Sequence, residues 1–313
     1  PQQSRGHQGL PGGALMQFFF EVLIAGLLSG VMYALVALGF VLIYKASGVF
    51  NFAQGAMVFF AALTTVGLQE KFGFSIWVAI PVTMVVMVAL GFVTERIVLR
   101  PLVNQHDITL FMATIGLTFF IEGLAQLVWG SEVRKLELGI ADEPIEAIMN
   151  STGMVVSKFD VTAAVICGAL VAALAFLFNK TKIGRALRAV ADDHQAALTV
   201  GIPLQHVWGV VWAVAGFVAL VAGLLWGARN GVQFALTFVA LKALPVLILG
   251  GFTSVPGAIV GGLIIGASEK LAEVYLGPMV GGGIEGWFPY VLALLFLLVR
   301  PEGLFGEKII RRI

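Results

Sequence analysis

The sequence predicts an all-α polytopic membrane protein, a helical bundle of about nine spans that includes broken or re-entrant helices. Hydrophobic residues make up 59% of the 313 residues and charged residues only 12%, a balance from which no soluble surface can be built. A spanning helix needs about 20 apolar residues. Apolar segments of about this length are drawn at 17–44, 52–69, 75–98, 108–129, 160–178, 205–228, 233–251, 255–276 and 285–300.

Composition limits what else the chain can carry. A formal net charge of +1 argues against a nucleic-acid partner. Cys167 is the single cysteine, which excludes disulfides and cysteine-based metal sites within the chain, and we expect no metal or cofactor. Residues 1–15 are rich in Gly, Gln and Pro and lack periodicity. We expect them to be a disordered leader or a processing remnant, with one membrane domain over 16–313.

The first segment is long and runs into a region rich in glycines and amides. Asn51 and Gln54 lie beside Gly48 and Gly55, so irregular backbone is expected here. Unsatisfied backbone in hydrocarbon costs several kcal/mol, roughly, and is tolerated only against protein or a water-filled cavity. Asn51 and Gln54 are one helical turn apart and either point together into such a cavity or cap a helix at the membrane interface.

A polar stripe follows the segment 108–129. Thr114 and Thr118 share one helical face, and Glu122 lies one turn further. This stripe either lines a path or makes hydrogen bonds between helices, which is the commoner role of threonine in membranes.

Lys242 lies within the segment 233–251. A lysine at the bilayer centre costs about 2.5 to 3.5 kcal/mol and marks a pathway or an ion pair, unless its side chain snorkels to water. Pro245 is expected to break the helix three residues later. Interrupted apolar regions at 48–56 and 242–257 thus occur in both halves of the chain, a pattern typical of broken helices around a transport site.

Glycines repeat at four-residue spacing in the following segment. Gly257 with Gly261, and Gly262 with Gly266, form two small-xxx-small pairs. Such pairs predict close helix packing.

The loop at 180–204 is too long for a simple turn. Leu187 and Val190 alternate with Arg185 and Arg188 at helical spacing, which predicts a surface helix pair suited to docking into a groove on a partner. The alternative is an ordinary positively charged loop. By the positive-inside rule, the loops rich in lysine and arginine face the cytoplasm. The loops on the same side of the membrane as residues 180–204 carry eleven of these residues: Lys45, Arg96, Arg100, Lys180, Lys182, Arg185, Arg188, Arg300, Lys308, Arg311 and Arg312. An outside N-terminus and an inside C-terminus follow.

Several stretches together resemble the branched-chain amino-acid ABC permeases of bacteria, of the LivH type: GLLSGVMYALVALG at 26–39, NFAQG at 51–55, GRALRAV at 184–190, LGGFTSVPGA at 249–258 and RPEGLFG at 300–306. The resemblance covers residue 16 to the C-terminus. It implies an importer of the bacterial inner membrane with a periplasmic substrate-binding protein, two permease subunits (a pair of copies or of paralogues) and two separate ATPase subunits. The ATPases would bind the loop through Gly184, Arg185, Arg188, Asp192, Asp193 and Gly201.

The sequence departs from the commoner family pattern near the expected path. Gln54 stands where histidine is frequent, and Ala56 stands where an acidic residue often follows the glycine. Leucine, isoleucine and valine are therefore not the only expected ligands, because relatives of this type also serve urea, short amides and small carboxylates.

The function expected from these observations is a permease subunit for branched-chain or other small amino acids, or for related small polar organic molecules. Its path residues are Asn51, Gln54, Thr114, Thr118 and Lys242. The chain has no Gly-x-x-x-x-Gly-Lys-Ser/Thr phosphate loop, so ATP hydrolysis is expected in partner subunits and the chain is not expected to be an enzyme.

A gradient-driven secondary transporter or channel is the alternative. It would use Lys242, Glu122 or Glu269 as intramembrane ion sites.

Overall fold

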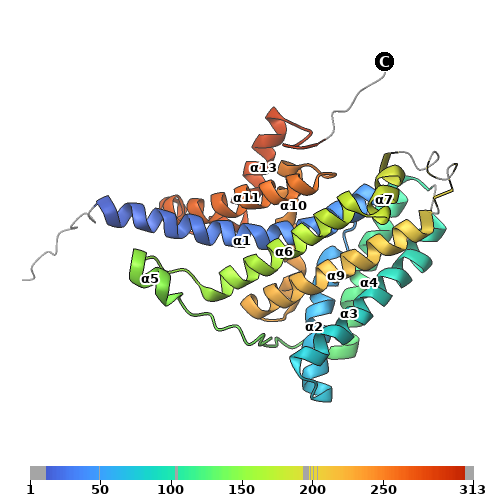
Figure 1. The fold of residues 1–313 in the computed structure, drawn as a ribbon, viewed down its shortest axis with the longest axis horizontal. Helices are drawn as coiled ribbons and strands as arrows, with labels where there is room; N and C mark the ends of the chain where they lie inside the picture. The colour runs from blue at the N-terminus through green and yellow to red at the C-terminus, as the bar shows by residue number, and fades with distance from the viewer. Residues whose placement is uncertain are drawn as a thin grey trace, which may run out of the picture.

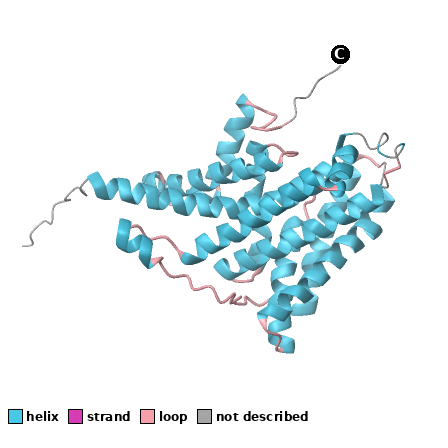
Figure 2. Ribbon diagram, in the orientation of Figure 1, coloured by secondary structure: helices cyan, strands magenta, loops and turns pink. Residues whose placement is uncertain are grey.

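The computed structural model describes residues 12–48, 50–102, 105–192, 197, 199, 201–202 and 204–306, and these form a bundle of helices (Figures 1 and 2). The longer helices are α1 (Gly12–Ser47), α2 (Gln54–Phe72), α3 (Ile76–Val93), α4 (Asp107–Trp129), α6 (Lys158–Lys180), α7 (Lys182–Asp192), α9 (Leu204–Asn230), α10 (Val239–Gly250), α11 (Val255–Tyr275) and α13 (Phe288–Val299). Short helical turns are η1 (Thr94–Leu99), η2 (Arg100–Leu102), α5 (Glu146–Thr152), η3 (Phe234–Phe238), α12 (Gly277–Val280) and η4 (Ile284–Gly286).

The predicted all-α membrane bundle is confirmed. Within the described residues, six helices are long and apolar enough to cross a membrane, and the apolar stretches 234–250 and 288–299 are shorter. Helix α2, which matches the remaining predicted segment, is buried along its first 15 residues. All the predicted apolar segments therefore correspond to helical segments, although their lengths differ.

Helix α1 runs through the middle of the bundle, with α10, α11 and α13 on one side and α6 and α9 on the other (Figure 1). It crosses α11 with backbone against backbone. A Cβ on Gly262 would lie 2.6 Å from the carbonyl oxygen of Gly30, and one on Gly266 would lie 2.4 Å from that of Gly26. The small-residue pairs predicted from the sequence thus allow this approach.

The other face of α11 is equally close to α10. A Cβ on Gly257 would lie 2.1 Å from the carbonyl oxygen of Gly250, and one on Gly261 would lie 2.5 Å from that of Val246. Helices α1, α10 and α11 therefore form one unit in which glycine contacts replace side chains.

The prediction that Pro245 breaks its helix is wrong. Helix α10 continues through Pro245 to Gly250. Proline leaves the carbonyl of the residue four positions earlier without its helical donor, and that residue, Leu241, is 43% exposed, so the loss does not fall in the packed interior. The interruptions lie on either side instead, at η3 before α10 and at Gly251, whose φ is +104°, after it.

Helix α1 begins at Gly12, four residues before the expected start of the membrane domain at Met16. Ala14 and Leu15 are strong helix formers directly continuous with the apolar run, so the helix extends into the predicted leader. Residues 1–11, the other part of that leader, lie outside the described residues.

The basic connections gather at one end of the bundle. Lys45 at the end of α1, Asn179 at the end of α6, Arg188 of α7 and Phe305 near the C-terminus line one common cavity. Gly153, after α5, lies beside Gln17 near the start of α1, at the opposite end of that helix. The arrangement agrees with the cytoplasmic assignment of the basic end, which remains a prediction.

Candidate functional site

The chain is broken between α1 and α2, as predicted. Gly48 has a φ of +69°, a conformation that glycine adopts without steric cost. Asn51 and Gln54 are both fully buried. The side-chain oxygen of Asn51 accepts from the backbone N–H of Ala53 at 3.1 Å, and its Nδ2 donates to Oε1 of Gln54 at 3.3 Å. Asn51 therefore ties the break to the residues at the start of α2, although the N-cap residue of α2, Ala53, makes no side-chain cap.

Gln54 fills a space opposite a glycine. A Cβ on Gly39 would lie 2.2 Å from its Nε2, so α1 and α2 approach each other at this point. Nε2 has no hydrogen-bond partner within the described residues. A buried amide donor left unpaired costs about 1–3 kcal/mol, and its presence here marks the break as a functional candidate.

Helix α4 is joined to the break by Thr114. This side chain is fully buried and its hydroxyl donates to the carbonyl oxygen of Phe50 at 3.1 Å. The hydroxyl of Thr118 donates to the carbonyl oxygen of Thr114 at 2.9 Å. The two threonines were predicted to line one path. In the structure, Thr114 bonds α4 to the break, and only Thr118 lines a cavity.

That aromatic cavity has a volume of about 270 Å³ and lies between α1, the break, α4, η3 and α10. Its lining is mostly aromatic and aliphatic, with three polar side chains: Phe40, Phe50, Phe52, Ile115, Thr118, Phe119, Glu122, Phe234, Thr237, Phe238, Ala240, Leu241 and Leu244. The rings of Phe40 and Phe50 stack at 4.9 Å, and Phe52 meets Phe50 edge-on at 4.7 Å. Such a mostly apolar pocket with a few polar groups suits a small organic ligand.

The aromatic lining was missed by the sequence analysis. Two of these phenylalanines, Phe50 and Phe52, lie in the break, and two others, Phe234 and Phe238, lie in η3. The concentration of phenylalanine around both irregular segments is the sequence feature that could have indicated this aromatic lining.

Lys242 forms an ion pair inside the bundle. Its Nζ lies 2.9 Å from Oε1 of Glu269 in α11 and 3.4 Å from the hydroxyl of Tyr33 in α1, and that hydroxyl donates to the same carboxylate oxygen at 3.2 Å. The side chain of Glu269 is 2% exposed and that of Lys242 is 30% exposed. Of the alternatives for Lys242, the structure shows the pair; the sequence analysis named Glu269 only as a possible ion site.

Further ion pairs join other elements of the bundle. Arg229 of α9 contacts Asp160 of α6. Lys270 of α11 donates to Glu285 at 2.8 Å, and this hydrogen bond holds the pKa of the Glu285 carboxylate below its usual range. Across the described ranges, no group of three His, Cys, Asp or Glu side chains is placed to hold a metal ion.

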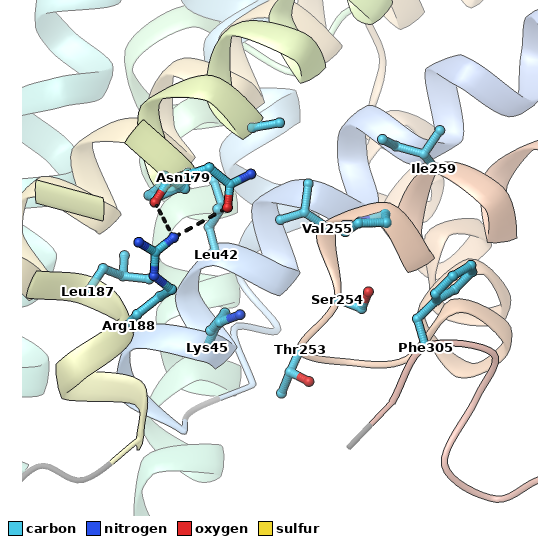
Figure 3. Close-up of a pocket in the computed structure, with 13 residues that line it drawn as sticks. Leu42, Lys45, Asn179, Leu187, Arg188, Thr253, Ser254, Val255, Ile259 and Phe305 are labelled. Atoms are coloured by element: carbon cyan, nitrogen blue, oxygen red, sulfur yellow. Dashed lines mark hydrogen bonds between the residues drawn. The ribbon is translucent and has the colours of Figure 1, made fainter. Parts of the chain in front are cut away.

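The predicted docking segment contains α7, which folds back on the end of α6. The hydroxyl of Thr181 accepts from the N–H of Gly184 at 3.1 Å. Nη1 of Arg188 donates to the carbonyl oxygen of Phe178 at 2.9 Å and to Oδ1 of Asn179 at 3.3 Å (Figure 3). A Cβ on Gly184 would lie 2.1 Å from the Phe178 carbonyl oxygen, so only glycine fits without a backbone shift.

The structure describes only some of the remaining predicted docking residues. Arg185 is exposed on α7. Asp192 is the last residue of α7, and neither its side chain nor Asp193 is among the described parts. Gly201 is an exposed turn residue with a φ of +81°. The structure thus brings Gly184 and Arg188 together, with Arg188 turned toward its own chain.

The chain is similar to known permease proteins over nearly its whole length. Residues 22–300 match the family described as "Branched-chain amino acid transport system / permease component". The high-affinity branched-chain amino acid transport system permease protein BraD of Pseudomonas aeruginosa is 26% identical, over 94% of this chain and 98% of BraD. The permease protein LivH of the corresponding Escherichia coli system is also 26% identical, over 95% of this chain and 98% of LivH. LivM, a permease protein of the same E. coli system, is 24% identical over 87% of this chain and 67% of LivM.

Proposed function

This chain belongs to the family of branched-chain amino acid transport system permease components, and from that membership we propose that it is a multi-pass permease subunit of an ABC importer in the inner membrane. Its cargo is a branched-chain or other small amino acid. The single observation that carries the proposal is the family match over 22–300, and the aromatic cavity beside the break between α1 and α2 supports it.

The chemistry of the cavity supports this class of cargo. Phenylalanine rings and aliphatic side chains provide most of the wall, and Thr118, Glu122 and Thr237 are the polar groups. An aliphatic side chain gains about 25 cal/mol for each Å² removed from water, whereas the polar groups of the ligand need only a few partners.

The path runs past this aromatic cavity. Thr118 lies in its wall, and Asn51, Gln54 and Thr114 hold the break that shapes it. Lys242 projects from α10, the helix whose residues 240, 241 and 244 line the cavity. Its ammonium is paired with Glu269 in the structure, so its proposed role as a carboxylate contact on the path requires that this pair open.

Transport by such a subunit requires other proteins. The chain pairs with a second permease, and its likeness to both LivH and LivM of one E. coli system supports a paralogue as that partner. Two ATPase subunits dock on α7 and the loop at 184–201, through the residues predicted from the sequence: Gly184, Arg185, Arg188, Asp192, Asp193 and Gly201. A periplasmic binding protein delivers the amino acid at the opposite end.

The gradient-driven alternative is weaker. The Lys242 ammonium and the Glu269 carboxylate neutralise each other in the structure, so neither is a free ion site in this state. The family match points to an ABC system instead.

Reconstitution tests the proposal. The chain is coexpressed with candidate permease and ATPase subunits from the same genome, and uptake of labelled leucine into liposomes is measured with the binding protein on the side of entry. We expect uptake that requires ATP and the ATPase subunits. Uptake by this chain alone, driven by a pH gradient without ATP, contradicts the proposal and supports the alternative.

A further inference from the structure

A second cavity lies at the basic end of the bundle, apart from the aromatic cavity (Figure 3). Its volume is about 260 Å³. Its lining comes from the end of α1, the end of α6, α7, the turn before α11 with the start of that helix, and the C-terminal segment: Leu42, Lys45, Ala175, Phe178, Asn179, Leu187, Arg188, Thr253, Ser254, Val255, Pro256, Ile259 and Phe305. The positive-inside rule assigns this end to the cytoplasmic leaflet.

Among the described residues that line this basal cavity, the charge is positive. Lys45 and Arg188 stand together on one side, with Thr253 and Ser254 across from them (Figure 3). No carboxylate is among the described residues that line it. Lys45 forms no ion pair with any described residue, and Arg188 uses its Nη1 only toward neutral oxygens. A concave site with two cations and hydroxyl groups attracts a phosphate.

The rest of the lining is apolar. Leu42, Phe178, Leu187, Ile259 and Phe305 contribute most of it. A small hydrated anion gains nothing from such walls, whereas a molecule with an anionic head and an apolar body is complementary to both parts. Basic pockets between membrane helices on the cytoplasmic side are typical sites for anionic lipid head groups.

We propose that the basal cavity binds the phosphate head group of an anionic lipid from the cytoplasmic leaflet, between Lys45 and Arg188 on one side and Thr253 and Ser254 on the other. The bound lipid spans α7 and the turn before α11, so it holds the docking helix against the central helices. An acidic segment of a partner protein fits less well, because both cations are recessed and Arg188 is already tied to the end of α6. Arg185 is the arginine that α7 exposes.

Native mass spectrometry of the full chain tests the proposal, with phosphatidylglycerol as the probe and phosphatidylcholine as the neutral comparison. Wild-type protein should retain phosphatidylglycerol preferentially. Lys45→Gln should lower the retained fraction about fivefold, the effect of one cation at an anionic surface. The matched control is Arg96→Gln, an exposed cation at the same end that does not line the cavity, and it should retain lipid like wild type.

A second variant separates lipid loss from misfolding. Ala175→Trp fills the apolar part of the cavity without altering its charge, and it should also lower the retained lipid. Both variants should melt within a few degrees of wild type. Equal lipid loss in Arg96→Gln overturns the proposal, because the effect then belongs to surface charge in general.

The source of the anion is decided by competition. Inorganic phosphate at millimolar concentration should displace little phosphatidylglycerol. Full displacement overturns the lipid assignment in favour of a soluble phosphate site. Loss of copurifying ATPase subunits in Lys45→Gln, with lipid retention unchanged, overturns it in favour of a protein contact.

Discussion

Replacing Lys242 by methionine should destabilise the bundle more than replacing Glu269 by glutamine, although both changes remove the same ion pair. The side chain of Glu269 is 2% exposed, so Lys242→Met leaves a buried carboxylate whose remaining partner is Tyr33. Breaking a buried pair in this way costs about 3–5 kcal/mol. Glu269→Gln keeps an oxygen that accepts from Tyr33 and leaves Lys242, 30% exposed, able to reach water, so we expect a cost of about 1–2 kcal/mol.

The assay is the free energy of unfolding of the full chain in bilayers, with the temperature of half-unfolding in detergent as a second measure. The double variant Lys242→Met with Glu269→Gln carries no buried charge at this site and should be more stable than Lys242→Met alone. Equal losses in the two single variants, or a double variant as unstable as the worse single one, refute the reasoning. The double variant also separates stability from transport, since a stable protein that no longer transports shows that Lys242 or Glu269 acts in transport itself.

The remaining predictions concern the glycines and the break. Gly184→Ala should displace α7 from α6 at a cost of about 1–3 kcal/mol and reduce ATP-driven uptake, whereas Gly168→Ala, where a Cβ meets nothing within 4 Å, should leave uptake unchanged. Gly262→Ala should lower the unfolding free energy by a similar amount because it forces α1 away, and Gly116→Ala, also in open space, serves as its control; equal effects contradict this packing. Asn51→Ala should cost about 1–3 kcal/mol, because it removes both the acceptor of the Ala53 N–H and the donor to Gln54; thermal unfolding unchanged from wild type argues against this role.

Much of the fold follows from local features of the sequence. The length of the apolar runs predicts the helices, Gly48 with Asn51 predicts the break, and the four-residue spacing of Gly262 and Gly266 predicts the close crossing. Each of these signals lies within a few residues of the feature that it specifies. The prediction for Pro245 was wrong because the effect of a proline on its helix depends on where the carbonyl that loses its donor points, and that of Leu241 does not fall in the packed interior.

The candidate site was less predictable because tertiary packing assembles it. The position of Lys242 in an apolar segment predicts a charge inside the bundle. That Glu269 is its partner follows only from the packing of α10 against α11. Phe50 and Phe234 meet at one cavity although they are far apart in the chain. The side chain of Arg188 points toward α6, a direction that helical periodicity does not specify.

The glycine crossing of α1 and α11 also constrains how the protein changes shape. Where two backbones touch, a shift by one residue, which moves a helix about 1.5 Å and turns it about 100°, brings a side chain such as Leu263 into a space that admits only hydrogen, so these two helices lack a neighbouring register to shift into. They behave as a stiff spine that rotates or translates as one body. Any opening of the bundle must then be absorbed at joints packed through side chains, such as those around α4, which makes the spine the reference frame for comparing conformations of this protein.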